Sequence, residues 1–160
     1  MLQCDQQNFT SLAQLLARFG LRLELVADGS PMPGSYWGAP EAGLVGQTIY
    51  ARADTPVHSV LHEASHVICM DSSRRTHLHT DAGGEFFEED AVCFLQIILA
   101  GNIGLSVDSI CADMDAWGYT FRLGSAQAWF EQDAAEARAW LVQHGLLTEV
   151  GTPTWRLRVA

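Results

Sequence analysis

The strongest chemical signal in this sequence is a His-Glu-x-x-His pattern, in which His62 and His66 flank Glu63. On a helix, residues four apart lie one turn apart on the same face, so both imidazoles can bind one metal ion. Glu63 then lies beside the ion, where its carboxylate can take a proton from a metal-bound water without being a ligand. Apolar residues at 60–61 and 67–69 indicate a buried helix rather than two exposed histidines. We therefore predict a metal site at His62 and His66, with Glu63 as the general base.

The third ligand of this site has several candidates. A catalytic zinc ion usually has three protein ligands and a water. Position 72, where the extended form of the motif has its third histidine, is Ser72. A later helix begins with acidic residues, and its apolar stripe extends back through Glu88, where a buried carboxylate is costly unless it is paired or bound to metal. We expect Glu88 to complete the site. The alternatives are Glu89, Glu85 and the loop histidines His77 and His79.

Other polar residues near the motif are candidates for roles besides metal binding. His58 lies four residues before His62, but about 12 Å along the helix axis from His66, so we do not expect it to share the ion. Stabilisation of an oxyanion needs a hydrogen-bond donor in the cleft. The candidates are Tyr36, Tyr50, Tyr119, His77 and His79; the sequence does not rank the tyrosines, and solvated loop positions are favoured for the two histidines.

The elements that must position these residues follow from the apolar periodicity and from the turn residues. The predicted order is a helix from Thr10 or Ser11 to Gly20, a strand at 21–27, a loop at 28–43, a strand at 44–52, a helix at 54–70, a loop at 71–84, a helix at 85–101, helices at 106–116 and 125–144, and a hairpin of 146–150 and 154–159. This order predicts an α+β fold: a small sheet packed on the motif helix and a second apolar helix, followed by C-terminal helices and a short hairpin.

Length and composition limit the class of protein. The 160 residues are typical of one domain, 1–160, and a hydrophobic content of 48% excludes a disordered chain. The sequence has neither a run of about 18 apolar residues nor a signal peptide, which predicts a cytoplasmic protein without a membrane partner. Nine basic residues, all arginine, face nineteen acidic ones, giving a net charge of −10. This charge repels phosphate backbones, so we expect no nucleic-acid partner and interpret the final hairpin as a packing element rather than a nucleic-acid-binding wing.

The four cysteines are widely spaced and form no Cys-x-x-Cys pair. Three of them lie inside apolar segments, as small buried thiols usually do. We therefore expect all four to be reduced and structural.

The motif resembles that of the zincin metalloproteins, and within them the glutamate-type branch (gluzincins) with His-Glu-x-x-His followed by a glutamate on a second helix. The small ImmA/IrrE-type peptidases, which cleave repressors, have a second helix reading Glu-x-x-Ala-Asn-x-Phe-Ala. Residues 88–95 of this chain (EEDAVCFL) keep the glutamate, the alanine and the phenylalanine, but Val92 replaces the asparagine. The resemblance implies a zincin-like domain, a zinc ion held by His62, His66 and Glu88, and cleavage of a peptide bond.

A second, more local resemblance is to the elongation factor P hydroxylases. It covers about twenty residues, from Ser59 to His66 and the paired Arg74 and Arg75. This resemblance implies iron at a site of two histidines and one carboxylate, which leaves coordination positions open for oxygen chemistry.

Three functions are compatible with these residues. The leading hypothesis is a zinc-dependent hydrolase of a peptide or protein substrate, with the strand at 44–52 beside the cleft, where an extended substrate can pair with it. The alternative is an iron-dependent hydroxylase with the same ligands. The third is a non-catalytic module in which the metal is structural or recognises a partner. The sequence does not indicate the oligomeric state.

Overall fold

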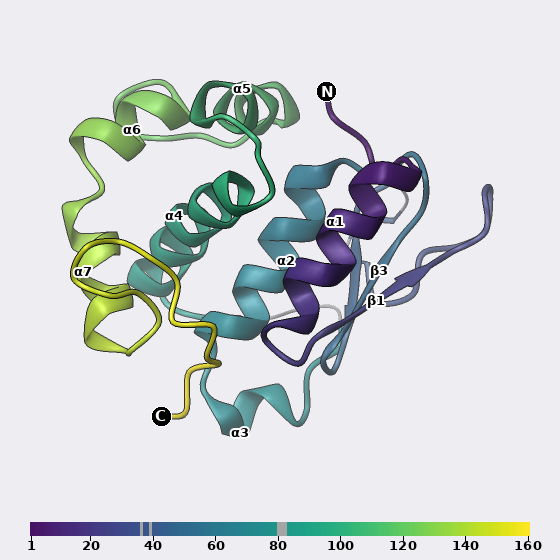
Figure 1. The fold of residues 1–160 in the computed structure, drawn as a ribbon, viewed down its shortest axis with the longest axis horizontal. Coiled ribbons are helices and arrows are strands. Elements are labelled where there is room, and N and C mark those ends of the chain that lie inside the picture. Colours follow the sequence, from purple (N-terminus) through teal and green to yellow (C-terminus); the bar gives the residue numbers. More distant parts are fainter. Residues whose placement is uncertain (36, 39, 80–82) are drawn as a thin grey trace.

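The structure is a computed structural model and describes residues 1–35, 37–38, 40–79 and 83–160. In this part of the chain, seven helices and a three-stranded sheet form the α+β fold expected from the sequence (Figure 1). The elements are α1 (Gln6–Ala17), β1 (Arg22–Leu25), β2 (Gly43–Val45), β3 (Thr48–Ala51), α2 (Val57–Cys69), α3 (Ser72–Arg75), α4 (Phe86–Asn102), α5 (Val107–Trp117), α6 (Ala126–Gln132) and α7 (Ala135–Gln143). No helix in the described ranges is long and apolar enough to cross a membrane.

The sheet has the order β1-β3-β2, with β1 parallel and β2 antiparallel to β3. The prediction of a single strand at 44–52 is therefore wrong. This segment forms the hairpin of β2 and β3, which turns at Gly46 and Gln47. Gly46 has a φ of +60°, which glycine adopts without steric cost and which a two-residue hairpin turn requires. Apolar residues lie on both sides of this turn, and its residues Gly46 and Gln47 are not the Asn-Gly or Asp-Gly pair that signals a hairpin most strongly, so the sequence does not reveal it.

The central element is α2, which lies between α1 and α4 (Figure 1). Its apolar side chains, among them Val60, Leu61 and Val67, are almost completely buried. Pro56 is the N-cap residue, and its extended backbone leads into the first turn. Asp54, at the start of the predicted helix, does not cap α2; its carboxylate pairs with Arg52 at 2.6 Å.

The second long helix, α4, packs against α2, α5 and α7. Its bounds agree with the prediction of 85–101 to within a residue at each end. The helix predicted at 125–144 is two helices, because the backbone leaves the helical region at Asp133, which has φ −134° and ψ 11°. The Asp133 carboxylate pairs with Arg122 from the preceding loop, a tertiary contact without a sequence signal.

Three other boundaries differ from the prediction. The first helix begins before Thr10, since Asp5 caps it by accepting from the backbone N–H of Asn8 at 2.8 Å. The predicted loop at 71–84 contains the short α3, capped by Asp71 through the N–H of Arg74. The C-terminal hairpin is reduced to one bridge, Leu147 with Pro153, after which the chain runs to the end of α2.

The C-terminal segment 156–160 lies beside α3 and the C-terminal end of α2 (Figure 1). The backbone N–H of Arg158 donates to the carbonyl of Ile68 at 2.9 Å, and the Arg158 side chain donates to the carbonyl of Cys69 at 3.1 Å. The buried guanidinium of Arg75 donates to three backbone carbonyls, including that of Arg158 at 2.8 Å. The last residues therefore satisfy carbonyl groups that the end of a helix leaves unpaired.

Candidate metal centre

Two histidines and a glutamate converge at the contact between α2 and α4. The Nε2 atoms of His62 and His66 are 3.1 Å apart, as expected for one face of a helix. The Glu89 carboxylate from α4 reaches both, with Oε1 3.4 Å from His62 Nε2 and Oε2 3.3 Å from His66 Nε2. These three ligand atoms lie within 4.8 Å of one another. The group can hold a metal ion, and two imidazoles with one carboxylate are donors for zinc or for iron.

The group contains Glu89 and not Glu88, which was the expected third ligand. Glu88 is 2% exposed, as its place in the apolar stripe predicts. Its carboxylate accepts from Arg74 Nη2 at 2.7 Å and from Arg158 Nη1 at 3.0 Å. A buried carboxylate needs compensation, and here two guanidinium groups supply it. Successive residues on a helix are about 100° apart, so Glu89 faces α2 when Glu88 faces Arg74 and Arg158.

The charge state of Glu89 suits a ligand. Partial burial raises the pKa of this carboxyl group, but the hydrogen bond with His62 and the positive charge of His66 outweigh burial and place the pKa below its ordinary value. Glu89 is therefore ionised at neutral pH, and 49% of its side chain is exposed. The centre is open to solvent on this side.

Glu63, the expected general base, is half-buried on α2 and lies outside the group of three ligands. Burial raises the pKa of its carboxyl group to about 7, although the positive charge of His62 acts in the opposite direction. The negative charges of Glu41 and Glu89 add to the rise. A carboxylate that titrates near neutral pH can both accept and release a proton under physiological conditions.

A residue that the sequence analysis missed, Gln96, orients His62. Gln96 is fully buried on α4, and its Oε1 accepts from His62 Nδ1 at 2.9 Å, which leaves Nε2 free to bind an ion. Its amide nitrogen donates to the carbonyl oxygen of His58 at 3.0 Å. Gln96 lies seven residues after Glu89, which is two helical turns and the same face. A buried polar residue at this spacing is the signal that would have favoured Glu89.

Tyr119 and His58 form a second layer around His62. The Tyr119 hydroxyl accepts from the Gln96 amide at 3.3 Å and lies 3.3 Å from His58 Nδ1. The ring of Tyr119 meets the ring of His62 edge-on, with centroids 5.4 Å apart. Burial raises the pKa of Tyr119 to about 12, so the hydroxyl keeps its proton. As expected, His58 does not belong to the ligand group; burial and the charge of His62 lower its pKa to about 3.

The remaining candidates lie elsewhere. Glu85 is the exposed N-cap residue of α4, and His77 and His79 are exposed on the connection between α3 and α4. None of the three belongs to the ligand group found in the described ranges. Tyr50 lies on β3, and Tyr36 lies outside the residues that the structure describes.

The edge of the sheet is already partly paired. On the outer strand β2, the N–H of Leu44 donates to the carbonyl of Gly34 at 2.9 Å. The N–H of Gly46, in the turn after β2, donates to the carbonyl of Leu78 at 2.9 Å. A substrate strand that adds to β2 would have to displace these contacts.

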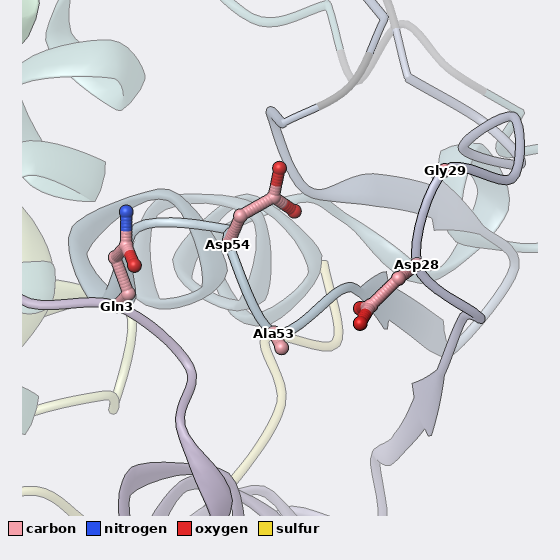
Figure 2. A pocket seen from close by; sticks show the side chains of 5 residues that line it. All are labelled: Gln3, Asp28, Gly29, Ala53 and Asp54. Carbon is pink, nitrogen blue, oxygen red and sulfur yellow. The ribbon is translucent and has the colours of Figure 1, made fainter.

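A separate pocket of about 270 Å³ lies beyond the ends of β1 and β3 and is shown in Figure 2. Gln3, Asp28, Gly29, Ala53 and Asp54 line it. It includes none of the residues that the sequence analysis singled out for chemistry.

No family model, curated protein or solved structure matches this chain. Its function therefore has to be inferred from its own residues.

Proposed function

We propose that this protein is a metal-dependent hydrolase of peptide or related amide bonds, with zinc held by His62, His66 and Glu89. The observation that carries the proposal is the convergence of these three side chains. Glu63, which follows His62 on α2, adds a carboxyl group with a pKa of about 7. The ligands named from the zincin resemblance are kept, except that Glu89 replaces Glu88.

Each residue has a defined task in this reaction. When bound, the zinc ion lowers the pKa of a water molecule and polarises the amide carbonyl. Glu63 accepts the proton of the attacking water and passes it to the leaving amine nitrogen, which requires a group that titrates near the working pH. Gln96 fixes His62 with Nδ1 protonated, so that Nε2 faces the ion. Tyr119 keeps its proton and is the described tyrosine in contact with His62, so it is the candidate donor to an oxyanion.

An iron-dependent hydroxylase is the second candidate. The donor set of two histidines and one carboxylate favours it as much as it favours zinc. The paired arginines of that resemblance have structural partners here, since Arg74 binds Glu88 and Arg75 binds backbone carbonyls. Those contacts hold the fold together and do not mark a reaction. The presence of the general base Glu63 favours hydrolysis.

The test combines metal analysis with turnover. Protein purified without added metal is analysed for zinc and iron, then incubated with a mixture of unstructured peptides, and the products are identified by mass spectrometry. We expect zinc in a ratio of about one per chain and cleavage of amide bonds. The Glu63→Gln variant should keep its zinc and lose about 10²- to 10⁴-fold in rate, because Glu63 moves protons but is not a ligand.

Glu85→Gln is the matched control, since Glu85 is exposed and outside the ligand group. Iron with oxygen consumption would instead support the hydroxylase. Bound metal with no cleavage in either the parent or the Glu63→Gln protein would leave a binding module and overturn the proposal.

A further inference from the structure

A second cavity lies next to the metal centre, between the start of α4, residues 120–122 and the junction of α6 with α7. Its volume is about 220 Å³. Phe86 and Asp90 line it from α4, on either side of the proposed ligand Glu89 in the sequence. None of the proposed ligands lines this cavity.

One wall of the cavity is aromatic. The rings of Phe121 and Trp129 are stacked, with centroids 4.8 Å apart and planes 27° apart. Trp129 is 4% exposed and also contacts Phe94 edge-on, which fixes its position. Phe86 adds a ring that is 73% exposed. Aromatic faces of this kind favour aliphatic chains and cations.

The same cavity has an excess of negative charge. Asp90, Asp133 and Glu136 line the cavity with a single cation, Arg122. Arg122 forms an ion pair with Asp133, whose carboxylate accepts from Arg122 Nε at 2.9 Å and also from Nη2. Asp90 and Glu136 form no ion pair within the described ranges. Two carboxylates thus remain for a ligand, in a cavity with a net charge of −2.

Two aromatic rings connect the cavity to the metal centre. The ring of Phe121 lies parallel to that of Tyr119, with centroids 6.4 Å apart, and Tyr119 contacts His62 at 5.4 Å. Phe86 lies one helical turn before Glu89 on α4. A peptide advances about 3.3 Å per extended residue, so a side chain one to three residues from a bond at the metal centre can reach the cavity.

We propose that this cavity binds the side chain of a lysine or arginine residue in the peptide substrate. The inference rests on the proposed function, because it names the class of substrate for the same site. The methylene groups of the side chain pack on Phe121 and Trp129, and the terminal cation meets Asp90 and Glu136. The net charge of −10 attracts basic peptides to the whole molecule, and the cavity adds a local position for one cation.

Binding is measured without turnover in the zinc-loaded Glu63→Gln protein, by the shift of the Trp129 indole N–H resonance on titration with capped pentapeptides. The peptides are Ala-Ala-X-Ala-Ala, where X is lysine, arginine, norleucine or glutamate. We expect the lysine or arginine peptide to bind at least fivefold more tightly than the norleucine peptide, and the glutamate peptide to bind most weakly. Norleucine keeps the aliphatic chain and removes the charge.

Asp90→Asn and Glu136→Gln, introduced separately into the same protein, should each weaken binding of the basic peptides about two- to fivefold and leave norleucine unaffected. Glu136 lies on α7, so its substitution tests the cavity without touching the residue that follows Glu89. Glu131→Gln is the matched control, as Glu131 is exposed on α6 and does not line the cavity.

Equal binding of lysine and norleucine peptides, or an affinity for the basic peptides that neither Asp90→Asn nor Glu136→Gln lowers, would overturn the inference. The two proposals fail separately. Basic peptides that bind at Trp129 in a protein without amide cleavage would contradict the hydrolase and leave the cavity assigned. Cleavage of peptides with no preference for a basic residue would contradict the assignment of the cavity and leave the hydrolase supported.

Discussion

The carboxylates of Glu88 and Glu89 are neighbours in the sequence and are compensated by different partners. Glu88 is buried against Arg74 and Arg158, whereas Glu89 contacts the two histidines. Their substitution should therefore separate stability from metal binding.

Glu89→Gln should weaken metal binding more than about 100-fold, beyond the 10- to 100-fold typical of residues that only orient a ligand. Glu88→Gln should keep metal binding nearly unchanged and lower the free energy of unfolding by about 1–3 kcal/mol, because the two arginines lose their counter-charge while partly exposed to solvent. Competition with a zinc chelator and urea denaturation measure the two effects. Loss of metal in Glu88→Gln with retention in Glu89→Gln would reverse the assignment.

The orientation of His62 depends on one buried amide. Replacement of Gln96 by Leu removes the acceptor of His62 Nδ1 and should weaken metal binding about 10- to 100-fold. Gln96→Glu restores an acceptor and should recover most of the affinity. The same chelator competition measures both variants, with Gln143→Leu on the exposed face of α7 as the control. If Gln96→Leu bound metal as tightly as the parent, Gln96 would have no role in positioning.

His58 should make stability depend on pH. Its pKa falls from an ordinary 6.5 to about 3 in the folded protein, mainly because it is buried against Trp117 and Tyr119 and secondarily because of the charge of His62. Between pH 6.5 and 3 the unfolded chain binds this proton and the folded chain does not. The contribution of His58 to the free energy of unfolding is therefore fully present above pH 6.5. It is lost as the pH falls towards 3, by about 1.4 kcal/mol per pH unit.

Replacing His58 with Gln should remove this contribution, so that the loss between pH 6.5 and 5 becomes smaller by about 2 kcal/mol than in the parent. Urea denaturation at both pH values measures it. The exposed His77 gives the control, His77→Gln. An unchanged slope in His58→Gln would show that this imidazole does not stay neutral in the folded state.

At the scale of the elements, the sequence predicts α2 and α4 well, because long apolar stripes with clear ends are strong helix signals. The hairpin at Gly46 is set by a single turn residue within a segment that reads as one strand. The break at Asp133 and the C-terminal bridge depend on contacts with distant residues. Local patterns contain no information on such contacts. The choice of Glu89 over Glu88 has the same cause, since the arginines that compensate Glu88 lie 14 and 70 residues away.

The C-terminal segment should stabilise the start of α4. Arg158 joins Glu88 on α4 to the carbonyl of Cys69 at the end of α2. Arg158→Met should lower the free energy of unfolding by about 1–3 kcal/mol and speed hydrogen exchange in the first turn of α4. Arg156→Met, at an exposed position, should change neither quantity. Equal effects of the two substitutions would show that the contact between the segment and Glu88 contributes nothing specific.

For the whole molecule, composition and periodicity were sufficient for the α+β class, since they depend on averages over many residues. The four cysteines are free and buried, in agreement with their predicted structural role. The single domain of residues 1–160, the cytoplasmic location and the absence of a nucleic-acid partner stay predictions. The His-Glu-x-x-His pattern includes two of the three side chains that could hold a metal ion, because positions i and i+4 of a helix lie on one face. The third comes from the packing of α4 on α2.

The most direct measurement is anomalous diffraction from crystals of the protein grown with zinc. We predict one peak at about 2.0–2.2 Å from the Nε2 atoms of His62 and His66 and from a carboxylate oxygen of Glu89, with Glu88 still bound to its two arginines. A peak coordinated by Glu88, or zinc bound only at other positions while His62 and His66 face solvent, would contradict the metal centre on which the proposed function depends.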